Sequence, residues 1–461
     1  MLTSDLIEKI RNELGDKAVL SGDQVGDKYL ADWSGETART QPPAVVRPAN
    51  TEELSVLLKL CHSAGQSIAI QGGLSGLSAG AIPESDELAV SLERMTGIEE
   101  IDQEAMTMTV LSGTPLQTVQ EAAAAANLTF PLDLGARGSC TIGGNVSTNA
   151  GGNQVIRFGM TRALIMGLEA VLADGTIMSS LNKMLKNNAG YDLKHLFIGT
   201  EGTLGVVTRV VLRLYPKLNS RCTALCALDS LSDSIKFLQQ TNSALAGTLS
   251  SYEVMWANYY EHVIEEVSHL HSPFDRQYPF YVLMEQEGSD QAHDNKKFQT
   301  LLESALESGL IKDAAIAQSE KESETFWQIR DGVGEILPSF APCANFDISV
   351  PISQMESFLA ETDKILLETF PSVRLLTFGH IGDSNVHYIA STGKKEDKNK
   401  IYDIVYRLTG KYNGSVSAEH GIGKIKREYL KYSRNETEVN MMRQLKTTFD
   451  PLGILNPGRV I

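Results

Sequence analysis

The sequence predicts an α+β fold with two domains, and three features of the chain support this prediction. Its 461 residues are enough for two or three domains. Two glycine-rich stretches, residues 71–81 and 131–152, are each bordered by short apolar segments typical of strands. The candidate elements do not alternate regularly between strand and helix, and the composition changes near Leu218. We therefore expect a first domain around the glycine-rich stretches and a second α+β domain after it.

The composition excludes several classes of function. Hydrophobic residues make up 42% of the chain and charged residues 21%, as in soluble globular proteins. A formal net charge of -16 argues against nucleic acid or an anionic membrane as the main partner. Five scattered cysteines predict a reducing compartment, so we expect a cytoplasmic protein without disulfides. No apolar run reaches the roughly 18 residues of a membrane span.

The first expected elements are two amphipathic helices. Leu2, Leu6, Ile10 and Leu14 recur at helical spacing among charged residues, which predicts a surface helix rather than a targeting peptide. A second helix is expected over 51–63. Its predicted cap is the asparagine before it, and a glycine follows its last turn.

A strand is expected at 67–70, directly before the first glycine-rich loop. A dinucleotide-binding Rossmann unit would need a helix to begin in that loop. The loop instead runs into residues 78–83, SAGAIP, which start a helix poorly. We therefore do not expect NAD binding of the Rossmann type.

Further elements complete the first domain. Strands are expected at 88–92 and 106–111, then a helix over 116–126 with Thr114 as its cap and Pro115 at its first position. The Asp-Gly pair in GLEAVLADGTIM, residues 167–178, predicts a hairpin. Residues 199–205 form another glycine-bearing turn before a long buried strand that ends at Pro216.

The second domain is expected to contain helices over 231–240 and 290–308 and a strand over 278–285. The last residues, FDPLGILNPGRVI, are too apolar for a free tail and are expected to pack on the first domain. The expected boundaries are 1–41 for an N-terminal lead-in, 42–216 for the first domain, 217–440 for the second, and 441–461 for the returning segment.

The two glycine-rich stretches give the first functional signal. Glycine admits positive φ and close approach, so successive backbone amides can form a cup for phosphate oxygens. Two such loops predict a diphosphate held between them, although flexible linkers would also be rich in glycine.

Histidines give the second signal. GHIGDSNVH carries His380 and His387 on either side of a turn, and SAEHGIG places Glu419 beside His420. Two imidazoles and a carboxylate suit a divalent metal, most readily zinc, with manganese or cobalt as alternatives. Hydrogen-bonded core histidines would fit the same spacing. His420 is a candidate general base, and an ordinary surface histidine is the alternative.

Six motifs together resemble a known family. They are GGLSGLSAGA, LGARGSCTIGGNVSTNAGG, IGTEGTLGVVT, GHIGDSNVH, SAEHGIG and DPLGILNPGRV. The chain resembles the FAD-linked dehydrogenases of the vanillyl-alcohol-oxidase type, and among them the D-2-hydroxy acid dehydrogenases. The resemblance covers residues 42–461. It implies a two-subdomain FAD-binding domain and an α+β substrate domain with an antiparallel sheet.

The resemblance implies FAD contacts along several loops. The first glycine loop and residues 139–145 would hold the pyrophosphate, residues 149–151 would line the flavin, residues 202–206 would hold the adenine side, and Asn456 would reach the isoalloxazine. Leu74 stands where members with covalent flavin often carry histidine, so we expect dissociable FAD and a merely packed Cys140. The implied cofactor residues are Gly72, Gly73, Leu74, Ser75, Gly76, Leu77, Ser78, Asp133, Leu134, Gly135, Ser139, Cys140, Gly143, Gly144, Asn145, Asn149, Gly151, Gly202, Val206 and Asn456.

The resemblance also implies the catalytic roles. His380, His387 and Glu419 would bind zinc, which would lower the pKa of the substrate hydroxyl. His420 would accept the hydroxyl proton while the C2 hydrogen leaves as hydride to the flavin. Arg330 would grip the substrate carboxylate through two-pronged donors, with Asn385 also near the substrate.

One position departs from the family pattern. Relatives selective for D-2-hydroxyglutarate tend to carry lysine where this chain has Asn345, in CANFDISVP. An amide lacks the charge that would anchor a distal carboxylate, so D-2-hydroxyglutarate, D-lactate and other D-2-hydroxy acids all stay open.

Other functions and partners are also considered. An oxygen-using flavin oxidase of the same fold is the main alternative, and a metal-dependent hydrolase is a more distant one. The family suggests an electron-transfer flavoprotein or a quinone as the electron acceptor. We also expect a homodimer.

Overall fold

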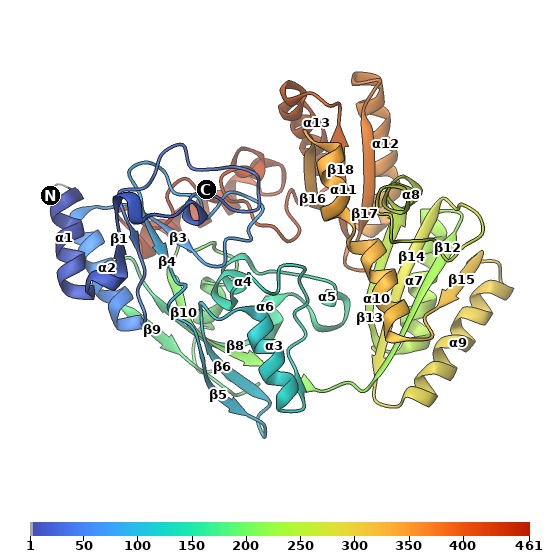
Figure 1. Cartoon of the computed structure of the whole chain (residues 1–461), viewed down its shortest axis with the longest axis horizontal. Helices are drawn as coiled ribbons and strands as arrows, with labels where there is room; N and C mark the ends of the chain where they lie inside the picture. Colours follow the sequence, from blue (N-terminus) through green and yellow to red (C-terminus); the bar gives the residue numbers. More distant parts are fainter. Residues whose placement is uncertain (1–2) are drawn as a thin grey trace. The chain divides into compact units, whose positions relative to one another are not determined.

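The computed structural model describes residues 3–461, and the chain forms two compact units (Figure 1). Unit 1 holds the described residues up to 152, residues 159–217 and residues 419–461. Unit 2 holds residues 153–158 and 218–418. The returning segment starts at Glu419, earlier than the expected residue 441, because residues 420–424 hydrogen-bond to Ser78 and Glu201 of unit 1.

The expected N-terminal helix is present as α1 (Thr3–Leu14) and belongs to unit 1 rather than to a separate lead-in. Its Leu6 and Ile10 are buried in one core cluster with Leu54 and Leu58 of α2 (Thr51–Ala64). Leu2 lies outside the described residues. The caps predicted for α2 are confirmed, because the Asn50 side chain accepts a hydrogen bond from the Glu53 N–H and Gly65 ends the helix at φ 64°.

Two main sheets form unit 1. The first has the strand order β1-β2-β4-β3, in which β4 pairs in parallel with both β2 and β3. The second is antiparallel with the order β5-β6-β10-β8-β9, and Gly175 turns its expected hairpin at φ 83°. Ile68 of β3 pairs with Leu455, so the prediction that the C-terminal segment packs on the first domain is confirmed.

One local prediction in unit 1 is wrong, and one short helix was not predicted. Pro115 is the cap of α3 rather than its first residue, because the Thr114 hydroxyl instead donates to the Gly97 carbonyl. A short helix, α4, forms inside the second glycine-rich stretch, where no helix was expected. Its glycines are tolerated because the Gly143 N–H donates to the Ser112 carbonyl at 2.7 Å and anchors the first turn.

Besides α1 and α2, unit 1 contains the following helices and strands, given in chain order. They are β1 (Val19–Leu20), β2 (Val45–Val46), β3 (Ile68–Gln71), β4 (Leu88–Ser91), β5 (Ile98–Asp102), β6 (Thr107–Leu111), α3 (Leu116–Ala125), β7 (Leu128–Thr129), α4 (Ile142–Thr148), α6 (Thr161–Leu164), β8 (Ile165–Val171), β9 (Ile177–Ser180), β10 (Val206–Arg213), β11 (Tyr215–Pro216) and α14 (Glu436–Phe449).

Unit 2 is built on one antiparallel sheet of seven strands, in the order β15-β12-β14-β13-β17-β18-β16. The prediction of an antiparallel sheet in the second domain is confirmed. Apolar side chains of α8, α10 and α11 join those of the central strands in one core cluster on one face. On the other face, Phe237 of α7 packs on Tyr252 of β13, and Tyr406 of α13 packs on Phe346 of β16.

The elements of unit 2 are α5 (Val155–Phe158), β12 (Ser220–Leu228), α7 (Leu231–Leu245), β13 (Leu249–Trp256), α8 (Ala257–Glu266), β14 (Phe280–Gly288), α9 (Gln291–Glu307), β15 (Asp313–Ile316), α10 (Glu320–Asp331), α11 (Val333–Phe340), β16 (Ala344–Ser349), α12 (Met355–Thr369), β17 (Arg374–Gly379), β18 (Asn385–Ser391) and α13 (Lys398–Lys411).

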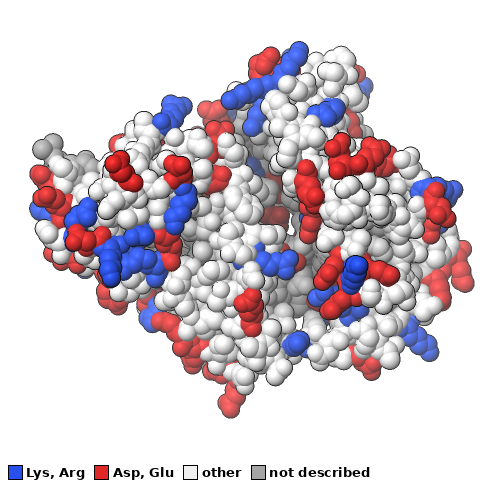
Figure 2. All heavy atoms as spheres, in the orientation of Figure 1, with Lys and Arg blue, Asp and Glu red and all other residues white. Residues whose placement is uncertain are grey.

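Three general features complete the description. All five cysteines are free thiols. Among residues 3–461, no helix is both long and apolar enough to cross a membrane. Lysine and arginine side chains are mixed with aspartate and glutamate over the visible surface (Figure 2).

Candidate active site

The loop after β3, residues 72–78, lies against the second glycine-rich stretch. A Cβ atom added to Gly73 would stand 2.0 Å from the Ser139 carbonyl oxygen, and one added to Gly72 would stand 2.9 Å from the Thr141 hydroxyl. Any side chain at Gly73 would therefore push the two backbones apart. Leu74 in the same loop has φ 56°, a left-handed conformation that is uncommon for leucine.

The backbone N–H groups of this loop are available to a ligand. Within the described part of the chain, the N–H groups of residues 72–78 donate no hydrogen bond to a protein acceptor. The buried Thr141 hydroxyl likewise has no partner among residues 3–461. Unpaired amides beside an unpaired hydroxyl suit phosphate oxygens, which accept hydrogen bonds. The loops thus fit the diphosphate of FAD.

The second glycine-rich stretch is packed tightly around α4. A Cβ atom on Gly143 would stand 2.6 Å from the Ser112 side chain, and Asn145 is buried within the helix. Gly144 lies beside Gly72, and the Ser139 hydroxyl donates to the Ala136 carbonyl. Burial raises the pKa of the neighbouring Cys140 thiol, which agrees with a packed rather than a reactive cysteine.

The residues expected along the flavin also lie in unit 1. A Cβ atom on Gly152 would stand 2.1 Å from the Asp133 carbonyl and 3.1 Å from the Leu134 side chain. Gly135, in contrast, has open space around it. Asn149 ends α4 at φ 51°, and its side-chain oxygen accepts a hydrogen bond from the Arg162 N–H.

Asn456 joins the glycine-bearing turn of residues 199–205 to β3. Its side-chain oxygen accepts a hydrogen bond from the Ile70 N–H at 2.7 Å, and its Nδ2 donates to the Glu201 carbonyl at 2.6 Å. Gly202 has φ 71° and leaves no room for a side chain beside Asn456, while Val206 is buried at the start of β10. Asn456 therefore supports the loops with both ends of its amide, and its contact with the isoalloxazine stays a prediction.

The loop that carries Glu419 and His420 is held by these same elements of unit 1. The Ser78 hydroxyl bonds to the His420 carbonyl at 3.0 Å, and the Glu201 carboxylate accepts the N–H groups of Ile422 and Gly423 at 2.7 and 2.9 Å. Burial raises the pKa of Glu201, although these two amides partly offset the effect. One Glu419 oxygen accepts the Gly152 N–H at 2.6 Å. The candidate base thus lies on a loop anchored to both glycine-rich stretches.

Unit 2 brings the two expected histidine ligands together. His380 follows β17, His387 lies on β18, and a turn with Ser384 at φ 70° joins the strands. Both imidazoles are buried, their centroids are 5.3 Å apart, and they offer ring nitrogens within 4.8 Å of each other. This spacing allows both to bind one cation.

Asp347 is a second acid at this place, and the sequence analysis did not select it. It pairs with His387 in the register of β16 and β18 and offers an oxygen within 4.8 Å of the His387 ring nitrogen. Asn385 is buried and donates to Asp347 at 2.7 Å, so Asn385 orients this carboxylate. Asn345 is exposed two residues earlier on β16, and the alternation of strand side chains puts it on the face of Asp347.

The buried carboxylate of Glu253 bridges Arg330 and His380. Glu253 of β13 accepts the Arg330 Nε–H at 2.9 Å, and its other oxygen lies 2.7 Å from His380 Nδ1. Burial alone would raise the pKa of Glu253, but the Arg330 cation and the hydrogen bonds from Arg330 and His380 outweigh it and lower that pKa to about 2. Burial would lower the pKa of Arg330, and the charges of Glu253 and Asp331 raise it above its usual value.

Most of the donors of Arg330 are engaged inside the protein. Of the five N–H donors of a guanidinium, Nε–H and one Nη2–H face Glu253, the other Nη2–H faces His380 Nε2 at 2.9 Å, and one Nη1–H faces Asp331 at 3.0 Å. One N–H is left. The two-pronged grip expected from the sequence would require Arg330 to release one of these partners.

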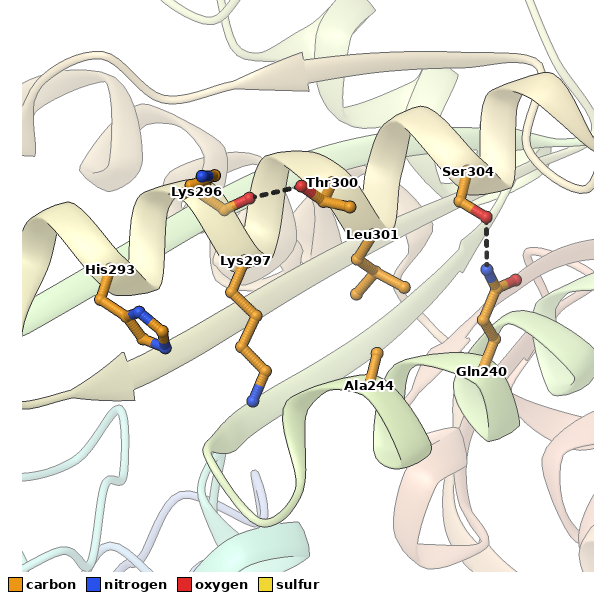
Figure 3. A pocket seen from close by; sticks show the side chains of 8 residues that line it. All are labelled: Gln240, Ala244, His293, Lys296, Lys297, Thr300, Leu301 and Ser304. Carbon is orange, nitrogen blue, oxygen red and sulfur yellow. Dashed lines mark hydrogen bonds between the residues drawn. The ribbon is translucent and has the colours of Figure 1, made fainter.

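A separate shallow hollow lies between α7 and α9 and is lined by lysines and polar side chains. His293 and Lys297 lean toward α7, and Gln240 bonds to Ser304 across it (Figure 3). Helix α7 packs on the Tyr252 face of the sheet, while Glu253 points to the opposite face. This hollow is therefore distinct from the candidate site.

Comparison with family models follows the two-domain division. Residues 42–180 match the family model described as "FAD binding domain", and residues 217–460 match "FAD linked oxidases, C-terminal domain".

Curated relatives match along nearly the whole chain. A D-2-hydroxyglutarate dehydrogenase from Arabidopsis thaliana, named as mitochondrial, is 35% identical over 100% of this chain and 82% of the relative. A D-2-hydroxyglutarate dehydrogenase from Xanthomonas citri pv. viticola is 35% identical over 94% of this chain and 92% of the relative. A putative mitochondrial D-lactate dehydrogenase from Schizosaccharomyces pombe is 34% identical over 94% of this chain and 84% of the relative.

Solved structures extend the likeness at the level of the fold. The substrate-bound structure of p-cresol methylhydroxylase is 16% identical, with a TM-score of 0.77 over 99% of this chain and 96% of that one. Alkyldihydroxyacetonephosphate synthase is also 16% identical, with a TM-score of 0.75 over 98% of this chain and 85% of that one. The expected vanillyl-alcohol-oxidase type of fold is confirmed. The chain belongs to the FAD-linked oxidase family, together with relatives named as D-2-hydroxyglutarate and D-lactate dehydrogenases.

Proposed function

We propose that this protein is an FAD- and zinc-dependent dehydrogenase that oxidises a D-2-hydroxy acid to the 2-oxo acid. The observation that carries the proposal is the buried group of His380, His387 and Arg330 in a chain whose full-length relatives are named as dehydrogenases of such acids. An imidazole pair and a guanidinium suit a small substrate that combines a hydroxyl with a carboxylate.

Unit 1 would hold FAD without a covalent bond. The unpaired amides of residues 72–78 and the Thr141 hydroxyl would bind the diphosphate, and the loops around Asn149 and Gly151 would border the flavin. Leu74 offers no nucleophile for covalent attachment. When bound, FAD supplies a two-electron oxidant, and a divalent cation supplies Lewis acidity toward a hydroxyl.

His380, His387 and Glu419 would hold the cation. Arginine can only donate hydrogen bonds, so His380 Nε2 must accept from Arg330 and therefore carries a lone pair. Cation binding at Nε2 would replace this hydrogen bond and free a second Arg330 N–H for the substrate carboxylate. Glu419 follows Ala418, whose N–H donates to the Asp347 carbonyl at 3.1 Å, so the chain passes directly from the histidine sheet to the third ligand.

His420 would accept the proton of the substrate hydroxyl. The Ser78 hydroxyl donates to its carbonyl, and the N–H groups of Ile422 and Gly423 donate to Glu201, so the backbone on which His420 stands is fixed. A base held by such contacts needs little reorganisation during reaction. Arg330 would orient the substrate by its carboxylate, so that the hydroxyl faces the base.

The proposal extends to the side chain of the substrate and to the electron acceptor. Asn345 would meet the distal end of the substrate and, as a neutral amide, would favour D-lactate or a similar monocarboxylate over D-2-hydroxyglutarate. Electrons would pass to an electron-transfer flavoprotein or a quinone. The homodimer and the cytoplasmic location stay predictions.

A substrate panel tests the proposal. Purified protein reconstituted with FAD and Zn²⁺ is mixed with matched D- and L-2-hydroxy acids, and reduction of an artificial dye is compared with release of hydrogen peroxide. We expect dye reduction with D-isomers only and little peroxide. Peroxide release in proportion to turnover would make the protein an oxidase, and no turnover with any 2-hydroxy acid would contradict the proposal.

A further inference from the structure

Glu253 stands at the centre of the candidate site, although the sequence pattern around it is that of a buried strand. The segment LSSYEVMW forms β13, the middle strand of the seven, and Glu253 is its single ionisable group apart from Tyr252. The residue is 1% exposed. A carboxylate buried in this way is costly unless positive charges and donors surround it.

Glu253 determines which nitrogen of His380 carries the proton and which carries the lone pair. Since His380 Nε2 accepts from Arg330, the proton of the neutral ring is on Nδ1, which donates to Glu253 at 2.7 Å. A carboxylate on one ring nitrogen fixes the tautomer and the ring orientation and makes the other nitrogen a better ligand. Nε2, which carries the lone pair, is the nitrogen proposed above to bind the cation.

Glu253 also balances the charge of Arg330. Both Nε and Nη2 of the guanidinium lie 2.9 Å from one Glu253 oxygen. Without this negative charge, the arginine cation would stand beside the bound divalent cation with only Asp331, on the opposite nitrogen, to compensate it. Removal of the carboxylate would therefore weaken cation binding twice, through the tautomer and through repulsion.

We propose that Glu253 is a positioning residue that presents His380 Nε2 to the metal and Arg330 to the substrate carboxylate. This inference rests on the proposed function, because it assumes that His380 is a metal ligand. The Glu253 carboxylate would then support both the metal ligand His380 and Arg330, which binds the substrate carboxylate. Metal affinity and the KM of the 2-hydroxy acid should thus depend on the same side chain.

The test compares Glu253→Gln with Glu285→Gln. Glu285 is also a buried carboxylate, on the neighbouring strand β14. It bonds to Thr223 and Trp327 and lies 3.8 Å from Arg221 Nε, and within residues 3–461 it forms no hydrogen bond or ion pair with His380 or Arg330. Zn²⁺ affinity is measured by competition with a chromogenic chelator on the FAD-loaded protein, and FAD content and thermal stability are recorded for each variant. We expect Glu253→Gln to weaken Zn²⁺ binding by about 10- to 100-fold. At saturating Zn²⁺ it should also raise KM more than it lowers kcat.

The control should keep wild-type Zn²⁺ affinity and KM. Equal Zn²⁺ affinity in Glu253→Gln and Glu285→Gln would overturn the inference and leave the proposed function intact. Failure of the wild-type protein to bind Zn²⁺ would instead overturn the metal dependence on which both rest.

A second pair of variants covers the case in which Glu253→Gln does not fold because Arg330 loses its counter-ion. Arg330→Met removes the buried cation, and the double variant Arg330→Met/Glu253→Gln then contains no uncompensated buried charge. If Glu253 positions His380, the double variant should bind Zn²⁺ more weakly than Arg330→Met alone. Equal affinities would again overturn the inference.

Discussion

Replacement of Gly73 by alanine tests the cofactor cradle at its tightest point. The added Cβ would stand 2.0 Å from the Ser139 carbonyl oxygen and 2.8 Å from Cys140 Cα, whereas ordinary contact begins at 3.4 Å. The two backbones would have to separate by about 1.4 Å, the difference between 3.4 and 2.0 Å. Overpacking of this kind costs about 1–3 kcal/mol, which corresponds to about 5- to 150-fold in an equilibrium constant.

The assay is titration of apoprotein with FAD, followed by quenching of protein fluorescence. Gly26→Ala is the matched control, because Gly26 lies in the same unit, has no atom within 4 Å of the added Cβ and does not have positive φ. We expect Gly73→Ala to weaken FAD binding by at least about fivefold while the control stays within about twofold of wild type. An FAD affinity of Gly73→Ala equal to that of Gly26→Ala would refute the argument that the two loops enclose the diphosphate.

Three further predictions concern catalysis, specificity and pH. His420→Ala should slow flavin reduction by about 100- to 10,000-fold at saturating substrate, as loss of a general base does, and a near-normal rate in stopped flow would remove it from that role. Asn345→Lys should raise kcat/KM for D-2-hydroxyglutarate relative to D-lactate by about tenfold or more, because a charged donor replaces an amide; an unchanged ratio would show that residue 345 does not meet the distal group. The pKa of Glu253 is lowered to about 2 on folding, so its ionised form stabilises the protein above its unfolded pKa of about 4.3 and this contribution disappears as the pH falls toward 2. Urea unfolding of the wild type should therefore lose stability between pH 5 and 3 more steeply than unfolding of Glu253→Gln, and parallel curves would contradict that assignment.

Local signals in the sequence were sufficient for much of the fold. The Asn50 cap, the Asp174-Gly175 hairpin and the apolar C-terminal segment each depend on contacts within a few residues or on a clear burial pattern. Helix α4 was missed because its glycines disfavour a helix, and its first turn is anchored by the distant carbonyls of Ser112 and Thr114. Thr114 was misassigned because its hydroxyl bonds to Gly97 across a turn rather than to the helix that follows.

Some residues of the candidate site could be predicted from the sequence and others could not. The motifs were sufficient to select His380, His387 and Arg330, which the fold brings together in unit 2. Glu253, Asp347 and Glu201 were not selected, because each is a single acid in an otherwise apolar or glycine-rich segment and its role depends on partners far away in the chain. One signal was available: a lone glutamate in the buried strand LSSYEVMW has to find a cation.

Single-turnover flavin reduction tests the central claim most directly. Protein loaded with FAD is prepared with Zn²⁺ and after verified removal of Zn²⁺, and each form is mixed anaerobically with D-lactate, L-lactate or D-2-hydroxyglutarate while the flavin absorbance is followed. We predict rapid bleaching by a D-isomer in the Zn²⁺-loaded form, no bleaching by L-lactate, and loss of the fast phase without metal while the yellow colour remains. Bleaching at the same rate in the metal-free form, or no bleaching by either D-acid, would contradict the account.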